Sequence, residues 1–392
     1  MRQGKALRAK ILITGGGTGG HVYPALSVMQ ALALALESAL PAESPFPPGG
    51  LSPSNAINAR SSDVTRLYIG NSQGLERTLV SDPRIKRLLF RMAAPSSLWG
   101  ALLLLLATIR CLGAIFRTRP NVTFSTGGYV SIPAVLASWI LRIPIVMFLP
   151  DVVPGKAVSW LLPLCKYISV STGDAATRLP TAKVTVTGYP VRSVFRSVTR
   201  EQARVRFGIP ADAFVLCVFG GSRGARALNQ AVAANLPEIL DRCHVLHICG
   251  DERLPEAQSA APNLNGTLRE RYQLFPYLHD DDMAAALVAA DLALCRSGAS
   301  TIGELPTAGV PAILVPLPET KVHQRENADF LMRHGAAVII ENDSLARDLL
   351  STVQGLIGDP ERLEQMRQAV HSLDRPDAAS AIAAVVMQAA TE

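Results

Sequence analysis

The stretch ITGGGTGGH at residues 13–21 decides how the chain begins to fold. A short apolar run precedes it and an Ala- and Leu-rich run, residues 18–37, follows it, which predicts a strand, a glycine loop and a helix. Gly15, Gly17 and Gly20 have the G-x-G-x-x-G spacing, in which absent side chains let main-chain N–H groups approach a phosphate at a helix N-terminus. This stretch therefore predicts an anion-binding loop that opens a Rossmann-like domain.

A nicotinamide-binding site is the first alternative for this loop. Such a site also needs a carboxylate at the end of the second strand, where it holds the ribose. The next predicted strand, residues 64–70, ends in Tyr68-Ile69-Gly70-Asn71 without an acidic residue. The sequence therefore disfavours a nicotinamide cofactor.

The same pattern starts again in the second half of the chain. Residues 214–219 form an apolar run, GGSRG follows at 220–224, and a helical run extends over 225–236. Because strands alternate with helices in both halves, we expect parallel sheets with helices on both faces. The predicted fold class is therefore α/β, with two Rossmann-like domains whose parallel sheets face each other across a cleft.

The length of 392 residues exceeds what one hydrophobic core usually supports, which agrees with two domains. We expect a first domain at 1–190 and a second at 191–372, with a hinge near 188–190 and a final helix, 373–392, packing back on the first. The further strands that we expect are residues 10–14, 122–125, 145–149, 168–170, 184–187, 244–249, 291–295, 312–315 and 337–340.

The charge is distributed unevenly. Residues 1–192 carry 20 Lys and Arg against 7 Asp and Glu, whereas the remainder carries 18 against 25. A basic half next to an acidic half favours an anionic partner for the first domain, either nucleic acid or an anionic membrane leaflet, although a solvated basic surface is the plain alternative.

An apolar stretch, LWGALLLLLATIRCLGAIF at residues 98–116, has almost the length of a membrane span. Arg110 interrupts it, so we favour a buried or interfacial helix. Basic residues surround it in the sequence: Arg84, Lys86, Arg87, Arg91, Arg117 and Arg119. The N-terminus lacks the apolar core of a signal peptide. The Pro-, Ser- and Gly-rich segment 38–62 predicts either a long loop or a disordered insert.

Metal-ligand patterns are missing from the sequence. The six cysteines have no CxxC spacing and lie in apolar runs, which is typical of buried thiols in a reducing compartment. The acidic run Asp280-Asp281-Asp282 precedes a helical stretch, where carboxylates are ordinary. We therefore expect neither a metal nor a cofactor.

Three further loops follow predicted strands and open helices: STGGYVS at 125–131, FGGSRGA at 219–225 and CRSGASTIGE at 295–304. Glycine loops at the carboxyl edge of a sheet form anion pockets, with plain turns as the alternative. In the last loop Glu304 lies one turn into the helix, where a carboxylate can accept two hydrogen bonds from a ribose diol or simply interact with the helix dipole.

Two side chains near these loops are candidates for the chemistry. His21 follows the first glycines, where a neutral imidazole can act as a general base or a histidine can merely lie on the helix surface. Arg192, after the predicted hinge, can add positive charge near a diphosphate or can be a solvated surface residue.

Taken together, these segments resemble the MurG-type N-acetylglucosaminyltransferases of peptidoglycan synthesis, and the resemblance covers nearly the whole length. The matching segments, in the family's order, are GGGTGGHVYPAL, TGGYVSIPA, GYPVR, GGSRGARALN, DDMAAAL, CRSGASTIGE, PAILVPLP and HQRENA. Several ordered motifs are far more specific than one glycine loop.

The resemblance implies a two-domain GT-B fold and an inverting glycosyltransferase. UDP-N-acetylglucosamine (UDP-GlcNAc) would be the donor and undecaprenyl-pyrophosphoryl-N-acetylmuramoyl-pentapeptide the acceptor, giving a β-1,4 linkage in the step from lipid I to lipid II. It also implies a peripheral enzyme at the cytoplasmic face of the cell membrane, held by an apolar patch ringed with basic residues, with a role in cell shape and division and no nucleic acid partner.

The family's functional positions map onto this sequence residue by residue. The donor would contact Thr18, Gly19, Gly20, Asp151, Arg192, Ser222, Leu278, Ala299, Ser300, Thr301, Ile302, Gly303, Glu304 and Gln324. Within this set Leu278 would meet the uracil, Glu304 the ribose and Ser222 the diphosphate. The acceptor would contact Gly17, Thr18, Gly19, His21, Gly127, Gly128 and Tyr129.

The main departure from the family is Phe148-Leu149-Pro150-Asp151, where His-Glu-Gln-Asn is usual. Asp151 can bind the sugar, replace His21 as the base, or cap the following segment, so both residues stay catalytic candidates. Three alternatives also stay open: a related transferase with another lipid acceptor, a UDP-GlcNAc epimerase, and a non-catalytic UDP-sugar-binding scaffold at the membrane.

Overall fold

A computed structural model of the chain describes residues 10–38, 66–93, 97–179, 183–221, 224–260, 264, 266–318 and 322–392. Ser222 and nearly all of the predicted 38–62 loop lie outside the described residues. The chain divides into two compact units. The first comprises Met1–Pro150, Pro154–Pro190 and Asp377–Glu392, and the second Asp151–Val153 and Val191–Pro376.

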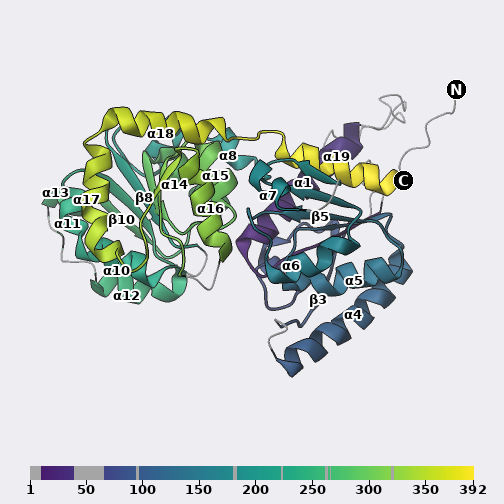
Figure 1. Ribbon diagram of the computed structural model, residues 1–392. Coiled ribbons are helices and arrows are strands. Elements are labelled where there is room, and N and C mark those ends of the chain that lie inside the picture. Colours follow the sequence, from purple (N-terminus) through teal and green to yellow (C-terminus); the bar gives the residue numbers. More distant parts are fainter. Residues whose placement is uncertain are drawn as a thin grey trace, which may run out of the picture. The chain divides into compact units, whose positions relative to one another are not determined.

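The first unit contains a parallel sheet of seven strands in the order β3-β2-β1-β4-β5-β6-β7 (Figure 1). The strands are β1 Ile11–Thr14, β2 Arg66–Asn71, β3 Ile85–Phe90, β4 Val122–Ser125, β5 Ile145–Leu149, β6 Tyr167–Val170 and β7 Val184–Val186. Its helices are α1 Gly19–Ser38, α3 Glu76–Leu79, α4 Leu98–Thr118, α5 Ile132–Ile140, α6 Lys156–Leu161, α7 Gly173–Thr177 and α19 Ala378–Thr391, with 3-10 turns η2 Tyr129–Ser131 and η3 Leu162–Leu164.

The second unit contains a parallel sheet of six strands in the order β10-β9-β8-β11-β12-β13. The strands are β8 Val215–Phe219, β9 His244–Ile248, β10 Tyr272–Phe275, β11 Leu292–Cys295, β12 Ala312–Leu314 and β13 Ala337–Ile339. The helices are α8 Val194–Ser197, α9 Arg200–Arg206, α10 Arg226–Ala234, α11 Leu236–Leu240, α12 Leu254–Ala260, α13 Gly266–Glu270, α14 Asp280–Ala289, α15 Thr301–Ala308, α16 Val322–Arg333, α17 Leu345–Ile357 and α18 Pro360–Ser372, with the 3-10 turn η4 Asp251–Arg253.

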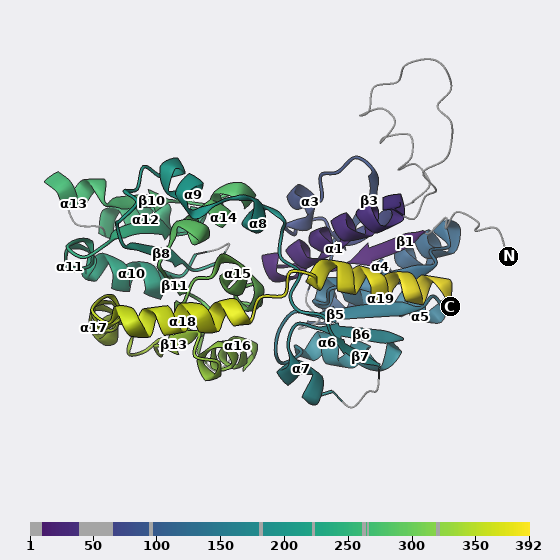
Figure 2. The ribbon, with the colours of Figure 1, turned by 90° about the horizontal axis from the view of Figure 1, so that it is seen from above.

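The central strands are buried on both faces because helices cover both sides of each sheet. Every residue of β1, β4, β5 and β11 is buried. In the first unit α19, the last helix of the chain, packs against α1 and buries Ile382 and Val386 (Figure 2). The predicted α/β class with two Rossmann-like, parallel-sheet domains is confirmed.

Two edge strands are absent from the sequence-based prediction, β3 and β10. The sequence of β3, IKRLLF, carries Lys86 and Arg87 at exposed positions, so it lacks the continuous apolar pattern of a central strand. The helix expected over 225–236 is confirmed as α10, but it ends earlier than predicted. Asn235 ends α10, and Pro237 lies in the first turn of a separate helix, α11, because proline is tolerated there and not in a helix interior.

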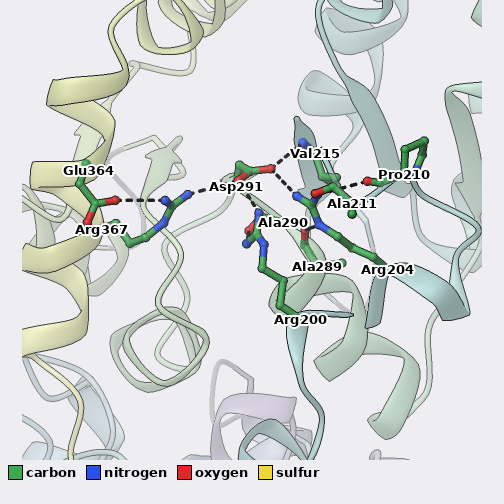
Figure 3. A network of polar contacts seen from close by, with 10 residues as sticks. All are labelled: Arg200, Arg204, Pro210, Ala211, Val215, Ala289, Ala290, Asp291, Glu364 and Arg367. Carbon is green, nitrogen blue, oxygen red and sulfur yellow. Dashed lines mark hydrogen bonds and ion pairs between the residues drawn. The ribbon is translucent and has the colours of Figure 1, made fainter. Parts of the chain in front are cut away.

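A polar cluster holds α9 and α18 against the sheet of the second unit (Figure 3). The Asp291 carboxylate accepts hydrogen bonds from Val215 N at 2.9 Å and Arg204 Nη2 at 2.9 Å. Arg200 also pairs with it, and Arg367 Nη2 lies 3.2 Å away. One carboxylate at the start of β11 therefore neutralises part of the charge of three arginines.

Candidate functional site

Each sheet has one topological switch point, where consecutive connections leave in opposite directions. In the first sheet it lies between β1 and β4, and in the second between β8 and β11. Ligands of open parallel sheets bind at the carboxyl ends of the strands at such points. The four loops selected from the sequence follow these four strands, so the strand order makes each pair of loops neighbours.

His21 is held in one orientation at the first switch point. Its Nδ1 lies 2.6 Å from the carbonyl oxygen of Thr126, and Thr126 Oγ1 donates to the carbonyl oxygen of His21 at 2.7 Å. Because a carbonyl oxygen only accepts, Nδ1 carries the proton in the neutral imidazole, and Nε2 is left as the acceptor. This tautomer is the one that a general base acting through Nε2 requires.

The second glycine loop lies directly against this imidazole. A Cβ on Gly128 would lie 3.7 Å from His21 Nε2 and 2.8 Å from Gly16 O, and Gly127 faces the opposite edge of the ring. Both glycines have positive φ angles, 85° and 81°, which disfavour other residues. The structure thus brings Gly17, Thr18, Gly19, Gly20, His21, Gly127, Gly128 and Tyr129 together at one switch point.

Glu76 is a buried carboxylate under the first loop, and the sequence analysis did not select it. Its side chain is 0% exposed, and its two oxygens accept from Asn71 N at 2.8 Å and Gly17 N at 3.3 Å. The signal in the sequence is weak, because a single Glu in the first turn of a helix is common.

At the second switch point the loop after β8 closes tightly on β9. Gly224 has a φ of 69°, and a Cβ there would lie 1.9 Å from the carbonyl oxygen of Cys249, so only glycine fits. Asn229 of α10 donates to the same carbonyl oxygen at 3.0 Å. This arrangement holds the N-terminus of α10 at the carboxyl edge of the sheet, where the Ser222 prediction falls outside the described residues.

Glu304 and Arg192, both predicted donor contacts, pair with each other. Arg192 Nη2 lies 3.1 Å from Glu304 Oε1, with side chains only 12% and 10% exposed. Glu304 lies in the first turn of α15, and Ala299 and Ser300 lie in the turn that precedes this helix. A largely buried carboxylate and guanidinium in one place can bind a ribose diol and a phosphate side by side.

Asn327 connects three predicted donor elements and was also missed. It is fully buried, and its Nδ2 donates to Asp151 Oδ1 at 2.8 Å and to Ser297 O at 3.2 Å, while Val152 N donates to its Oδ1 at 3.0 Å. Ser297 Oγ in turn donates to Gln324 O at 2.7 Å. Asp151, the turn before α15 and Gln324 therefore form one network of hydrogen bonds.

Two further residues of the second unit lie near the carboxyl ends of its strands: Leu278, and a buried histidine in β9. Leu278 is 9% exposed and precedes α14, whose predicted start at the Asp280 run agrees with the structure. His247 of β9 contacts Tyr272 Oη at 2.9 Å and Asn229 Oδ1 at 3.1 Å. Burial lowers the pKa of His247 to about 4, so it is neutral at physiological pH.

Two Rossmann-like domains with glycine loops at the switch points are the architecture of GT-B glycosyltransferases. The N-terminal domain profile of glycosyltransferase family 28 matches residues 51–169, and the family's C-terminal domain profile matches residues 215–382. The chain belongs to glycosyltransferase family 28.

Two proteins that are similar to this chain over nearly their whole length carry the same name. A UDP-N-acetylglucosamine–N-acetylmuramyl-(pentapeptide) pyrophosphoryl-undecaprenol N-acetylglucosamine transferase from Roseiflexus sp. (strain RS-1) is 38% identical, over 95% of this chain and 93% of its own. A transferase of the same name from Desulforudis audaxviator (strain MP104C) is 37% identical, over 96% and 97%.

Solved structures share the fold at low identity. The crystal structure of Acinetobacter baumannii MurG superposes with a TM-score of 0.70 at 23% identity, over 97% of this chain and 99% of that one. A UDP-GlcNAc 2-epimerase from Neisseria meningitidis, bound to UDP-GlcNAc, gives a TM-score of 0.68 at 15% identity, over 97% and 100%. Transferases and epimerases thus have the same architecture, and the family assignment rests on the sequence.

Proposed function

We propose that this protein transfers N-acetylglucosamine from UDP-GlcNAc to undecaprenyl-pyrophosphoryl-N-acetylmuramoyl-pentapeptide in peptidoglycan synthesis. The observation that carries the proposal is the 38% identity to a transferase of that name over nearly both full lengths. The oriented imidazole of His21 supports a transfer that begins with loss of a hydroxyl proton.

In the proposed reaction His21 Nε2 takes the proton of the acceptor hydroxyl as its oxygen attacks the anomeric carbon. The new carbon–oxygen bond forms as the bond to the UDP oxygen breaks, and UDP leaves with the electron pair. Attack from the face opposite the leaving group inverts the anomeric centre. Thr126 contributes by holding the tautomer that leaves Nε2 unprotonated.

On the donor side we propose that Glu304 binds the ribose and that Arg192 stabilises the departing diphosphate. Their mutual pairing at 3.1 Å orients both groups before the donor arrives. We also propose that neither a metal nor a cofactor takes part, since a guanidinium and helix N-termini supply positive potential. Unchanged turnover in excess chelator is the expected result, and a loss restored by Mg²⁺ would contradict it.

Asp151 has a different proposed role from His21. Its Oδ1 accepts a hydrogen bond from the buried Asn327 amide, which belongs to the same network as Gln324 and the turn before α15. We therefore propose that Asp151 binds the transferred sugar and that His21 is the base.

The test is transfer of labelled N-acetylglucosamine to a short-chain lipid-linked muramoyl-pentapeptide, with diacylglycerol as the alternative acceptor. His21→Gln should lower kcat at least about a hundredfold while UDP-GlcNAc still binds. Asp151→Asn should retain turnover with a raised KM for the donor. Turnover with diacylglycerol alone, or sugar interconversion without acceptor, would replace this proposal with a related transferase or an epimerase. Donor binding without any turnover would indicate a scaffold.

We further propose that the first unit docks on an anionic membrane surface at the cytoplasmic face through α4, without nucleic acid as a partner. Among the described residues α4 is the helix long and apolar enough to span a bilayer, but one of its faces packs on α5. Leu104, Ala107, Cys111 and Ile115 form that buried face.

The other face of α4 is apolar and exposed. Its outward residues include Leu98, Trp99, Leu102, Leu105, Leu106, Ile109 and Phe116. Arg110, Arg117 and Arg119 are exposed on or next to the helix, and Lys86 and Arg87 on β3. Apolar and aromatic side chains beside arginines are the composition of an interfacial helix, and each basic residue near an anionic surface contributes about 1 kcal/mol.

Vesicle co-sedimentation tests this docking. The wild type should bind vesicles that contain phosphatidylglycerol. The double variant Leu105→Glu/Ile109→Glu should bind them about tenfold more weakly, because it loses apolar insertion. Val205→Glu is the matched control, since Val205 is an exposed apolar residue of α9 in the second unit. Equal binding by the α4 variant, or no binding by the wild type, would contradict the proposal.

A further inference from the structure

The buried Glu76 carboxylate lies in a space that glycines leave open. A Cβ built on Gly16 would lie 2.4 Å from Glu76 Oε1, and one on Gly74 would lie 2.3 Å from Oε2. A Cβ on Gly70 would lie 2.8 Å from Glu76 Cγ. We call this space, lined by Gly16, Gly70 and Gly74, the Glu76 pocket. Larger residues at these positions would displace the carboxylate.

Glu76 joins the end of β2 to the loop after β1, and the Asn71 side chain links both to the segment after β4. Asn71 N, at the end of β2, donates to Oε1, and Gly17 N, in the loop after β1, donates to Oε2. Asn71 Nδ2 also lies 3.4 Å from Tyr129 Oη, after β4. Burying a carboxylate is costly, and main-chain N–H donors offset that cost only in this loop conformation.

An anion-binding loop normally leaves its N–H groups to the ligand. Here the Gly17 N–H points to a carboxylate of the same chain, so Glu76 occupies one anion position of the loop before any substrate arrives. The substrate diphosphate would then meet the amides from Thr18 onward, at the start of α1, and not that of Gly17. This differs from the role that the resemblance implies for Gly17.

We infer that Glu76 is a positioning residue: it acts as a built-in anion that sets the Gly15–Gly20 backbone, and through it the placement of His21 on the first turn of α1. The inference rests on the proposed function, since it assigns Glu76 to the acceptor side of that reaction. Positioning errors of about 1 Å reduce rates by about a hundredfold, so a displaced loop lowers kcat strongly.

Glu76→Gln removes one acceptor and turns an NH₂ group toward a main-chain N–H. We expect kcat to fall about tenfold to a hundredfold, with an unchanged KM for UDP-GlcNAc. Ile168→Ala, a buried change in β6 of the same unit, is the control for general destabilisation and should not change kcat below its melting temperature. Equal kcat losses in the two variants would indicate a merely structural role and would overturn the inference.

A double-mutant cycle tests the contact itself. Gly74→Ala should lower kcat by displacing Glu76, because all three nearest atoms to the new Cβ belong to that side chain. In a Glu76→Ala background the same change should have no further effect. Additive effects would overturn the inference.

Hydrogen exchange provides a readout independent of turnover. Loop amides 15–22 should exchange faster in both Glu76→Gln and Gly74→Ala than in the wild type. A wild type without turnover would reject the proposed function, and the exchange rates would still decide whether Glu76 holds the loop. Unchanged exchange in both variants would overturn the inference even if the wild type is active.

Discussion

His21 and Thr126 hold each other through two reciprocal hydrogen bonds, one from the imidazole to a carbonyl oxygen and one from a hydroxyl to a carbonyl oxygen. The two residues lie 105 positions apart, in the segments that follow β1 and β4, which are neighbours in the sheet. A base on the first turn of a helix is thereby fixed from the opposite loop, and its Nε2 lies on the edge of the ring that Gly128 approaches.

Removing this base should slow transfer strongly without loss of donor binding. We expect His21→Gln to lower kcat by about a hundredfold to ten-thousandfold, the usual contribution of general base catalysis. Thr126→Val should lower it by about tenfold, because it removes the hydroxyl but keeps the carbonyl acceptor. Initial rates measure both effects, and calorimetric titration with UDP-GlcNAc checks donor affinity. A fully active His21→Gln enzyme would reassign the base.

Breaking the Asn327 network should affect the donor side. Asn327→Ala leaves the Asp151 carboxylate and the Ser297 carbonyl without this donor, at a cost of about 1–3 kcal/mol in unfolding free energy. We expect a raised KM for UDP-GlcNAc with a smaller change in kcat. Asn235→Ala is the control, since its amide bonds within its own helix region at Ala231 O. An unchanged donor KM would remove Asn327 from the site.

The Asp291 cluster should contribute strongly to the stability of the second unit. Asp291→Asn leaves Arg204, whose side chain is 6% exposed, without its charged partner, and we expect a loss of about 3 kcal/mol in unfolding free energy. Asp348→Asn, at an exposed pair with Arg347, should have no measurable effect. Denaturant unfolding compares the two, and equal midpoints would show that the three-arginine cluster is energetically neutral.

Acid should destabilise the protein partly through His247. Burial lowers its pKa from the usual 6.5 to about 4, so the folded state disfavours the protonated imidazole. The neutral imidazole's contribution to the free energy of unfolding is fully present above pH 6.5. It is lost as the pH falls from 6.5 toward 4. The loss amounts to roughly 3 kcal/mol by pH 4.

Comparison of the wild type with His247→Gln isolates this contribution. Between pH 7 and pH 4.5 the unfolding free energy of the wild type should fall more steeply than that of the variant. If the unfolding free energies of the two proteins fall in parallel with pH, protonation of His247 does not disrupt its buried contacts with Asn229 and Tyr272.

Much of the architecture was predictable from local patterns. The alternation of apolar runs with helical runs identified two parallel-sheet units, and the ordered motifs identified the family. Glycine loops were recognisable because their spacing reflects local main-chain requirements, such as the positive φ angles at Gly17 and Gly128. The roles given to individual site residues stay predictions.

Only the tertiary structure decided which loops meet and what holds them. Strand order depends on long-range pairing, so the meeting of the His21 loop with the Thr126 loop is not encoded by spacing. The charged edge strand β3 and the buried groups Glu76 and Asn327 were missed for a related reason. A polar residue is a surface residue by default, and only the backbone donors and acceptors that fold around it allow its burial.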